Sequence, residues 1–134
     1  MLTKQSLSLE AANRVLAAAR DAANSIRPVS IAVVDDAGVL LAFARMDGAR
    51  GYTADLAIQK ARSSALVGVA SSILAKAGVQ TGGAGGEPVL HDGNCVGAVG
   101  VSGAKEEDDV SVARHAVRLL PTRTVNSDIL PESD

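Results

Sequence analysis

The stretch from Gly85 to Val117 constrains the fold more than any other part of the chain, because two structural periodicities follow one another in it. A Gly-Gly turn leads to an apolar run that opens at Val89, a tight turn at residues 91–94, and a second apolar run over 95–101. Two apolar runs joined by so short a turn predict a β-hairpin. Apolar residues then recur at helical spacing until Pro121, which predicts a helix whose acidic first turn suits its positive N-terminal end.

The first half of the chain repeats this order of elements. Ser8 predicts the N-cap of a helix that runs from Leu9 to about Arg27, and Pro28 prevents its continuation. Apolar runs at 30–34 and 39–46, on either side of a turn ending in Gly38, predict another hairpin.

A third helix is predicted from residue 54 to about 71, with Thr53 as its cap and small residues in a row along one side. Five glycines between residues 78 and 86 predict a mobile loop or a backbone cradle rather than a packed element.

Helices that alternate with hairpins predict an α+β fold, with helices packed on a mainly antiparallel sheet. The strands of the first hairpin are apolar on both faces, so helices, or helices and a partner subunit, should cover both. The length of 134 residues predicts one domain over 1–121, followed by a polar tail over 122–134. Only 1% of the residues are aromatic, and a core of small side chains favours additional packed area through oligomerisation.

Charge and hydropathy argue against several classes of protein. A net charge of −2 and the absence of a basic cluster with aromatic residues disfavour nucleic acid binding. No run approaches the roughly 18–20 apolar residues of a membrane span, and the N-terminus lacks a secretory apolar region, so we expect a cytoplasmic location and no membrane partner. The single cysteine, Cys95, is predicted to be a buried, reduced thiol.

Two segments resemble a known family. They are AVVDDAGVLLAFARMDGA (Ala32–Ala49), with the following AIQKARSSA helix, and GGEPVLHDGNCVGAVGVSGAKEEDD (Gly85–Asp109). The chain is similar over most of residues 5–118 to the GlcG/HbpS-like family of glycolate-operon and haem-binding proteins, and to the C-terminal domain of PduO-type corrinoid adenosyltransferases. The resemblance implies a profilin-like, three-layer α/β/α domain with a five-stranded antiparallel sheet. It also implies homo-oligomers and, in some members, binding of haem or a corrinoid. Members usually carry a longer segment where this chain has residues 72–84.

The best polar constellation in the sequence is Arg45, Asp47 and Lys60, beside the Gly-rich loop. Two cations there suit a carboxylate or a haem propionate, whereas a structural ion pair with Asp47 is the alternative. The resemblance implies that these three positions belong to a pocket or an interface. We therefore predict ligand binding by these residues together with Gly85, Gly86 and Glu87.

Two further side chains carry candidate chemistry, each with a plainer alternative. His91 is a candidate haem or metal ligand, although a solvated turn residue is the more frequent role. Glu87 is a candidate general base, although an exposed loop carboxylate is more frequent. His115 is predicted to lie on the surface or at an interface.

Three functions follow from the sequence. The first is a homo-oligomeric protein that binds a small ligand, either haem or a related tetrapyrrole or a small anionic metabolite. The second is a small lyase or isomerase that uses Lys60, Asp47 or Glu87 as acid-base groups. The third is a structural subunit without catalysis.

Overall fold

The computed structural model describes residues 4–120 and 129–132 of the chain. Its elements, in chain order, are β1 (Lys4–Leu7), α1 (Leu9–Asn24), β2 (Ser30–Asp35), β3 (Leu40–Arg45), α2 (Tyr52–Val67), α3 (Ser71–Lys76), β4 (Gly86–His91), β5 (Asn94–Ser102), α4 (Glu106–Arg118) and β6 (Ile129–Glu132). The predicted order of helices and hairpins is confirmed, and α3 and the strands β1 and β6 are additions to it.

The main sheet has four antiparallel strands in the order β3-β2-β5-β4. Within it, Ser30 at the start of β2 lies opposite both Arg45, which ends β3, and Ser102, which ends β5. Gly86, which begins β4, pairs with Gly100 on β5. These residues therefore share one end of the sheet, which we call the Arg45 end.

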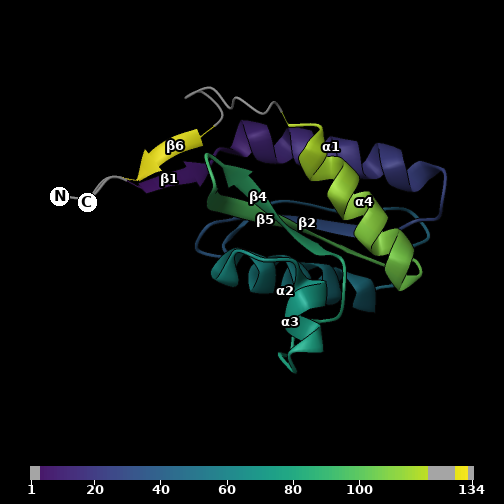
Figure 1. Cartoon of the computed structure of the whole chain (residues 1–134). Helices are drawn as coiled ribbons and strands as arrows, with labels where there is room; N and C mark the ends of the chain where they lie inside the picture. Colours follow the sequence, from purple (N-terminus) through teal and green to yellow (C-terminus); the bar gives the residue numbers. More distant parts are fainter. Residues whose placement is uncertain (1–3, 121–128, 133–134) are drawn as a thin grey trace.

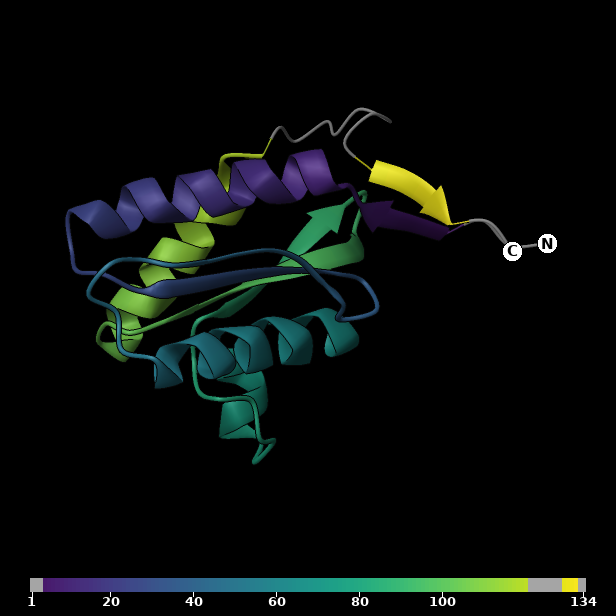
Figure 2. The ribbon, with the colours of Figure 1, turned by 180° about the vertical axis from the view of Figure 1, so that it is seen from behind.

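Helices cover both faces of this sheet, as the apolar strands predict (Figure 1). Helices α1 and α4 lie on one face, and α2 lies on the other with α3 beyond it, an arrangement that is also visible from behind (Figure 2). The larger core, between the sheet and α1 and α4, includes Val15, Ile31 and Val112. The core under α2 is built mainly from alanines. Alpha+beta architecture with an antiparallel sheet between helices is thus confirmed.

The small residues under α2 have a steric reason. A Cβ atom added at Gly100 of β5 would overlap the backbone carbonyl of Ala57 and would lie 2.6 Å from the backbone nitrogen of Ala61. Helix and strand therefore approach backbone to backbone, and only glycine fits at that position of β5. The alanine row of α2 is what this close approach requires.

The expectation of a five-stranded sheet is wrong for the part of the chain that is described, because its main sheet has four strands. The first strand, β1, pairs with β6 and forms a separate two-stranded sheet with Lys4 opposite Glu132. This small sheet projects beside the domain (Figure 1). Part of the tail predicted over 122–134 is therefore a strand, while residues 121–128 and 133–134 lie outside the described structure.

The predicted cap of α2 is also wrong. The N-cap is Gly51, and Thr53 lies inside the helix, where its hydroxyl donates to the Arg50 carbonyl at 2.6 Å and shares a 2.8 Å hydrogen bond with the Ser30 hydroxyl. Thr53 thus ties α2 to the start of β2. At the other end, Gly68 adopts a left-handed conformation with φ of 82° and stops the helix earlier than predicted.

The Gly-rich loop is held in place by hydroxyl groups. The Ser71 hydroxyl donates to the Gly83 carbonyl at 2.8 Å and accepts from the Gly86 amide at 2.8 Å. The Thr81 hydroxyl and the Gly83 amide lie 3.1 Å apart. These bonds favour the interpretation of the loop as a backbone cradle.

Edge strand β3 is less covered than the sequence predicts. Leu40 and Phe43 lie on its α2 side, opposite Val34 and Ala32, yet they are 45% and 37% exposed. Within residues 4–120, no helix has the length and the apolar character that crossing a membrane requires.

Candidate functional site

A buried lysine joins three elements at the Arg45 end. Lys60 extends from α2, is 4% exposed, and its Nζ donates to the Val101 carbonyl of β5 at 2.9 Å. The same Nζ lies 3.3 Å from Oδ2 of Asp109 on α4. Asp109 is itself buried, and its Oδ1 accepts from the Ala104 amide at 3.0 Å. The two charges therefore connect the layers on both sides of the sheet.

Glycines at the start of β4 make room for this lysine. A Cβ atom at Gly85 would lie 3.3 Å from Cδ of Lys60 and 2.5 Å from the Val101 carbonyl oxygen. A Cβ atom at Gly86 would overlap the Lys60 backbone carbonyl. The structure thus brings Lys60, Gly85 and Gly86 together, and the glycines act by giving the lysine a path past the edge of the sheet.

Burial dominates the electrostatics of the pair. It lowers the pKa of Lys60, and the attraction of Asp109 and Glu106 only partly opposes this effect. It also raises the pKa of Asp109, against the opposing influence of Lys60 and of the Ala104 amide. The two pKa values move towards each other, so transfer of a proton from Lys60 to Asp109 is easier here than it is in water.

A hollow of about 310 Å³ opens onto this pair, and we call it the Lys60 hollow. Its lining residues are Tyr52, Leu56, Lys60, Gly82, Gly83, Ala84, Ser102, Gly103, Ala104, Glu106 and Asp109. Ser102 is 4% exposed. Its hydroxyl has no hydrogen-bond partner within residues 4–120 and 129–132. A hydroxyl without a partner on the wall of a hollow can form a hydrogen bond with a bound molecule.

Arg45 and Asp47 lie at the same end of the sheet but line a different hollow, of about 550 Å³, together with Arg20. Arg45 is two strands away from Ser102, roughly 10 Å across the sheet, and its guanidinium donates to the Ala49 carbonyl at 3.3 Å. The structure therefore does not bring Arg45 and Asp47 into the Lys60 hollow.

Between these two hollows lies a third, of about 500 Å³, whose lining includes Arg27, Arg50 and Lys105. It shares Pro28 with the Arg45 hollow, and Tyr52, Gly103 and Ala104 with the Lys60 hollow. We call the cations around these hollows the cationic rim; its members are Arg20, Arg27, Arg45, Arg50 and Lys105. None of them forms an ion pair with another described residue.

Glu87 is neither exposed nor in a loop, which corrects the more frequent role expected for it. It lies in β4, is 8% exposed, and its Oε1 accepts from Nε of Arg114 on α4 at 3.0 Å. The strand places it on the α4 side of the sheet, while Lys60 approaches from the α2 side. The three acid-base candidates Lys60, Asp47 and Glu87 are thus not brought together.

His91 ends β4, roughly 17 Å along the strand from Gly86. Its side chain is only 11% exposed, so it is not the solvated turn residue that is more frequent at such positions. The Nε2 atom lies 3.4 Å from Oδ2 of Asp92, and Nδ1 is buried without a partner among the described residues. No cluster of three metal-binding side chains occurs in the described part of the chain. His115 lies exposed on α4, as expected for a surface or interface residue.

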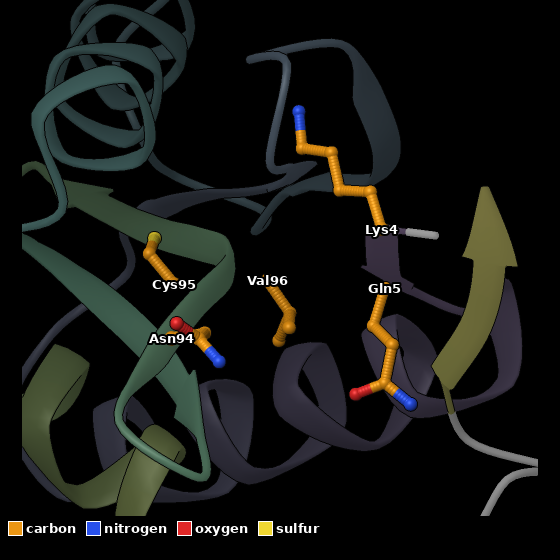
Figure 3. A pocket seen from close by; sticks show the side chains of 5 residues that line it. All are labelled: Lys4, Gln5, Asn94, Cys95 and Val96. Carbon is orange, nitrogen blue, oxygen red and sulfur yellow. The ribbon is translucent and has the colours of Figure 1, made fainter. Parts of the chain in front are cut away.

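A hollow of about 530 Å³ lies between β1 and the end of the β4–β5 hairpin (Figure 3). Cys95 lines it as a free thiol that is only partly buried, so the expectation of a buried, reduced thiol is met in part. The Cys95 Sγ lies 3.2 Å from the Gly97 carbonyl, and burial raises the pKa of this thiol. The side chains drawn from β1 and β5 leave the space between them open (Figure 3).

Sequence reasoning missed Asp109 and Ser102. Asp109 closes a run of four acidic residues, Glu106–Asp109, and is the one that is buried. A signal was available in the sequence. Asp109 lies three residues before Val112 and four before Ala113, and this spacing places it on the same, buried face of α4. Ser102 gives no signal beyond its place at the end of an apolar strand.

Comparison with known proteins places this arrangement in a family. Protein GlcG of Escherichia coli K12 is 39% identical over 114 residues, which cover 76% of this chain and 85% of GlcG. The crystal structure of a double mutant of Streptomyces reticuli HbpS superimposes with a TM-score of 0.83 at 34% identity, covering 90% of this chain and 91% of HbpS.

A crystal structure of a PduOC:heme complex gives a TM-score of 0.77 at 24% identity, over 89% of this chain and 99% of PduOC, and shows the same fold. The model of the family described as haem degrading protein HbpS-like matches residues 7–118. The two buried charges, the glycines beside them and the surrounding sheet thus belong to a domain of known type, and the chain is a member of the HbpS-like family.

Proposed function

We propose that the chain binds a small ligand carrying carboxylates at the Arg45 end of the sheet, either haem or a related tetrapyrrole or a small anionic metabolite. The observation that carries the proposal is the cationic rim. Five cations line two adjoining hollows there without an ion pair to another described residue. Guanidinium groups bind carboxylates in a bidentate manner, so an anionic ligand supplies the partners that these side chains lack.

Membership in the HbpS-like family supports haem as one candidate for this ligand. The residues fit a haem in part. The rim offers cations to its propionates, and His91 offers an imidazole that has a carboxylate beside one nitrogen and no described partner on the other. A carboxylate that orients the ring in this way is typical of histidines that bind metals.

His91, however, lies at the opposite end of β4 from the rim. One haem held within one subunit therefore does not take both its propionate contacts and its axial ligand from these residues. We propose that the rim binds the carboxylates, and that an axial contact from His91 comes from a neighbouring copy of the chain after the imidazole turns outward, because its Nδ1, which has no described partner, is buried here.

Self-association has support of its own. Exposed apolar side chains occur on β3 and on the outer side of α2, among them Leu40, Phe43 and Leu66. A second copy packed there would bury them, as the small-residue core and the family resemblance led us to expect.

A haemin titration followed by absorbance tests the proposal. The variants are Arg45→Ala in the rim and His91→Ala at the other end of the sheet, with Lys76→Ala on α3 as a control cation outside the rim. We expect a saturable Soret shift that weakens several-fold with Arg45→Ala, changes its spectrum with His91→Ala, and is unaffected by Lys76→Ala.

Equal affinity in the Arg45→Ala variant would exclude the rim as the haem site. If haemin does not bind at all, the same variants are compared for binding of a small dicarboxylate by calorimetry. Failure of both ligands to bind would overturn the proposal and favour a purely structural subunit.

A further inference from the structure

The Lys60 hollow contains a primary amine in an unusual setting. A lysine ammonium has three N–H donors, and the structure gives the Lys60 Nζ two partners, the Val101 carbonyl and Asp109. The third position has no partner among the described residues, and Lys60 lines the hollow. Most lysines lie in water, whereas this one is held at a fixed place on the wall of an open hollow.

Two neighbours complete the chemistry that an amine needs to react with a carbonyl group. Asp109, 3.3 Å from Nζ, takes and returns protons. The Ser102 hydroxyl, which lacks a described partner, is a donor for a carbonyl oxygen in the hollow. Gly83 has no side chain to cover the lysine. A Cβ atom at this position would lie 3.8 Å from Cε of Lys60, in van der Waals contact with it, so the absence of this atom leaves the lysine side chain uncovered there.

We propose that Lys60 forms a reversible imine with small aldehydes and 2-oxo acids that enter the Lys60 hollow. The choice of ligand class follows from the neighbouring hollow. That space shares Tyr52, Gly103 and Ala104 with the Lys60 hollow and carries Arg50 and Lys105, so a carboxylate next to the reacting carbonyl finds cations there.

The step balances without another reactant. Lys60 transfers a proton to Asp109, and the neutral amine adds to the carbonyl carbon to give a carbinolamine. Asp109 then protonates the departing hydroxyl group, which leaves as water, and a protonated imine remains paired with the Asp109 carboxylate. One ammonium and one carbonyl thus give one iminium and one water, with no net gain or loss of protons.

The electrostatics favour this sequence. Burial lowers the pKa of Lys60 and raises the pKa of Asp109, and each unit of depression raises the neutral fraction of an amine about tenfold at neutral pH. Glu106 is the other charged group near Lys60, and its attraction favours the protonated amine. Hence the reaction should be faster when Glu106 is neutralised.

Reductive trapping tests the proposal. The full-length protein is incubated at pH 7 with pyruvate or acetaldehyde and sodium cyanoborohydride, and the modified lysines are identified by peptide mass spectrometry. The exposed residue Lys76 on α3, which lies outside the hollows at the Arg45 end, serves as an internal reference. We expect Lys60 to be modified at least about tenfold faster than Lys76, because burial lowers the pKa of Lys60.

Three variants separate the reaction from simple accessibility. Lys60→Arg keeps the charge beside Asp109 and should abolish the fast adduct, whereas Lys76→Arg should leave it unchanged. Asp109→Asn should slow trapping at Lys60 by about a hundredfold, the lower range for loss of a general acid-base group. Circular dichroism confirms that each variant is folded.

Modification of Lys60 no faster than that of Lys76 in the native protein would overturn the inference. So would an unchanged rate in a folded Asp109→Asn variant. A faster reaction of pyruvate than of acetaldehyde supports a 2-oxo acid, and the reverse supports a simple aldehyde. The inference shares Arg50 and Lys105 with the cationic rim, but its failure is distinguishable from failure of the haemin titration, because Arg45 and His91 take no part in it.

Discussion

Replacing Lys60 and Asp109 singly and together should show that the two residues act as one unit. Among the described residues, Lys60→Met leaves the Asp109 carboxyl buried with only neutral backbone groups of Ala104 and Gly103 beside it, and Asp109→Asn leaves the Lys60 charge without its closest counter-ion. Removal of one partner from a buried ion pair costs about 3–5 kcal/mol. Both side chains are about 95% buried, so this range applies to each single variant without a discount for solvent screening.

The double variant Lys60→Met with Asp109→Asn should recover most of that loss, because neither buried group is then charged. We expect a coupling free energy of at least about 2 kcal/mol, and a double variant within about 1 kcal/mol of the natural protein. Equilibrium unfolding in urea, monitored by circular dichroism, measures all four proteins. Single losses that simply add in the double variant would refute the assignment of a coupled pair.

Measuring the free energy of unfolding of the same four proteins as a function of pH gives a second test of the coupled pair. The pKa of Asp109 is raised on folding, so its contribution to stability falls as the pH rises from about 3.8 through the folded pKa. The pKa of Lys60 is lowered, so its contribution rises again as the pH increases from the folded pKa towards 10.5. Relative to the double variant, the natural protein should be least stable between these two windows.

Two shorter predictions concern the glycine contact and the cysteine. Gly100→Ala should destabilise the domain by about 3 kcal/mol in the same urea assay, because the added Cβ would overlap the backbone of α2. The control is Gly51→Ala, whose added Cβ has the Arg45 guanidinium as its nearest neighbour, at 3.9 Å. This variant should lose less than about 1 kcal/mol of stability. An equal loss in both would contradict the steric argument. Cys95 should react with iodoacetamide more slowly in the native protein than in urea at pH 8, because burial raises its pKa, and equal rates would show that the thiol is not protected.

Local chemistry made the elements of this fold predictable. Ser8 caps α1 as expected, with its hydroxyl accepting from the Ala11 amide at 3.1 Å, and both hairpins occur where turn residues interrupt apolar runs. The local errors are confined to the two ends of α2, and the others concern long-range pairing. Nothing within residues 4–7 indicates that their partner lies at 129–132. The expected fifth strand of the main sheet came from the family resemblance, and the two hairpins account for the four strands that the sheet has.

The candidate site was predictable only in part for a related reason. Lys60 and the Gly85–Gly86 pair were singled out by residue type, and the structure places them in contact. Asp109 was taken for a residue of an acidic first turn because its neighbours are acidic too, and only the packing of α4 on the sheet distinguishes the buried carboxylate from the exposed ones. Arg45 was placed with Lys60 because both lie near the same end of the sheet, but the order of strands separates them.

The pairing of β1 with β6 brings residues from the two extremes of the described chain opposite each other, Lys4 beside Glu132, roughly 5 Å apart between Cα atoms. A short peptide linker is therefore enough to join Lys4 to Glu132. New ends opened at residues 92–93, in the turn of the β4–β5 hairpin, would then leave the contacts of Lys60 intact. The domain is in this respect a natural starting point for a circular permutant, in which a reporter is attached on the side of the sheet away from the cationic rim.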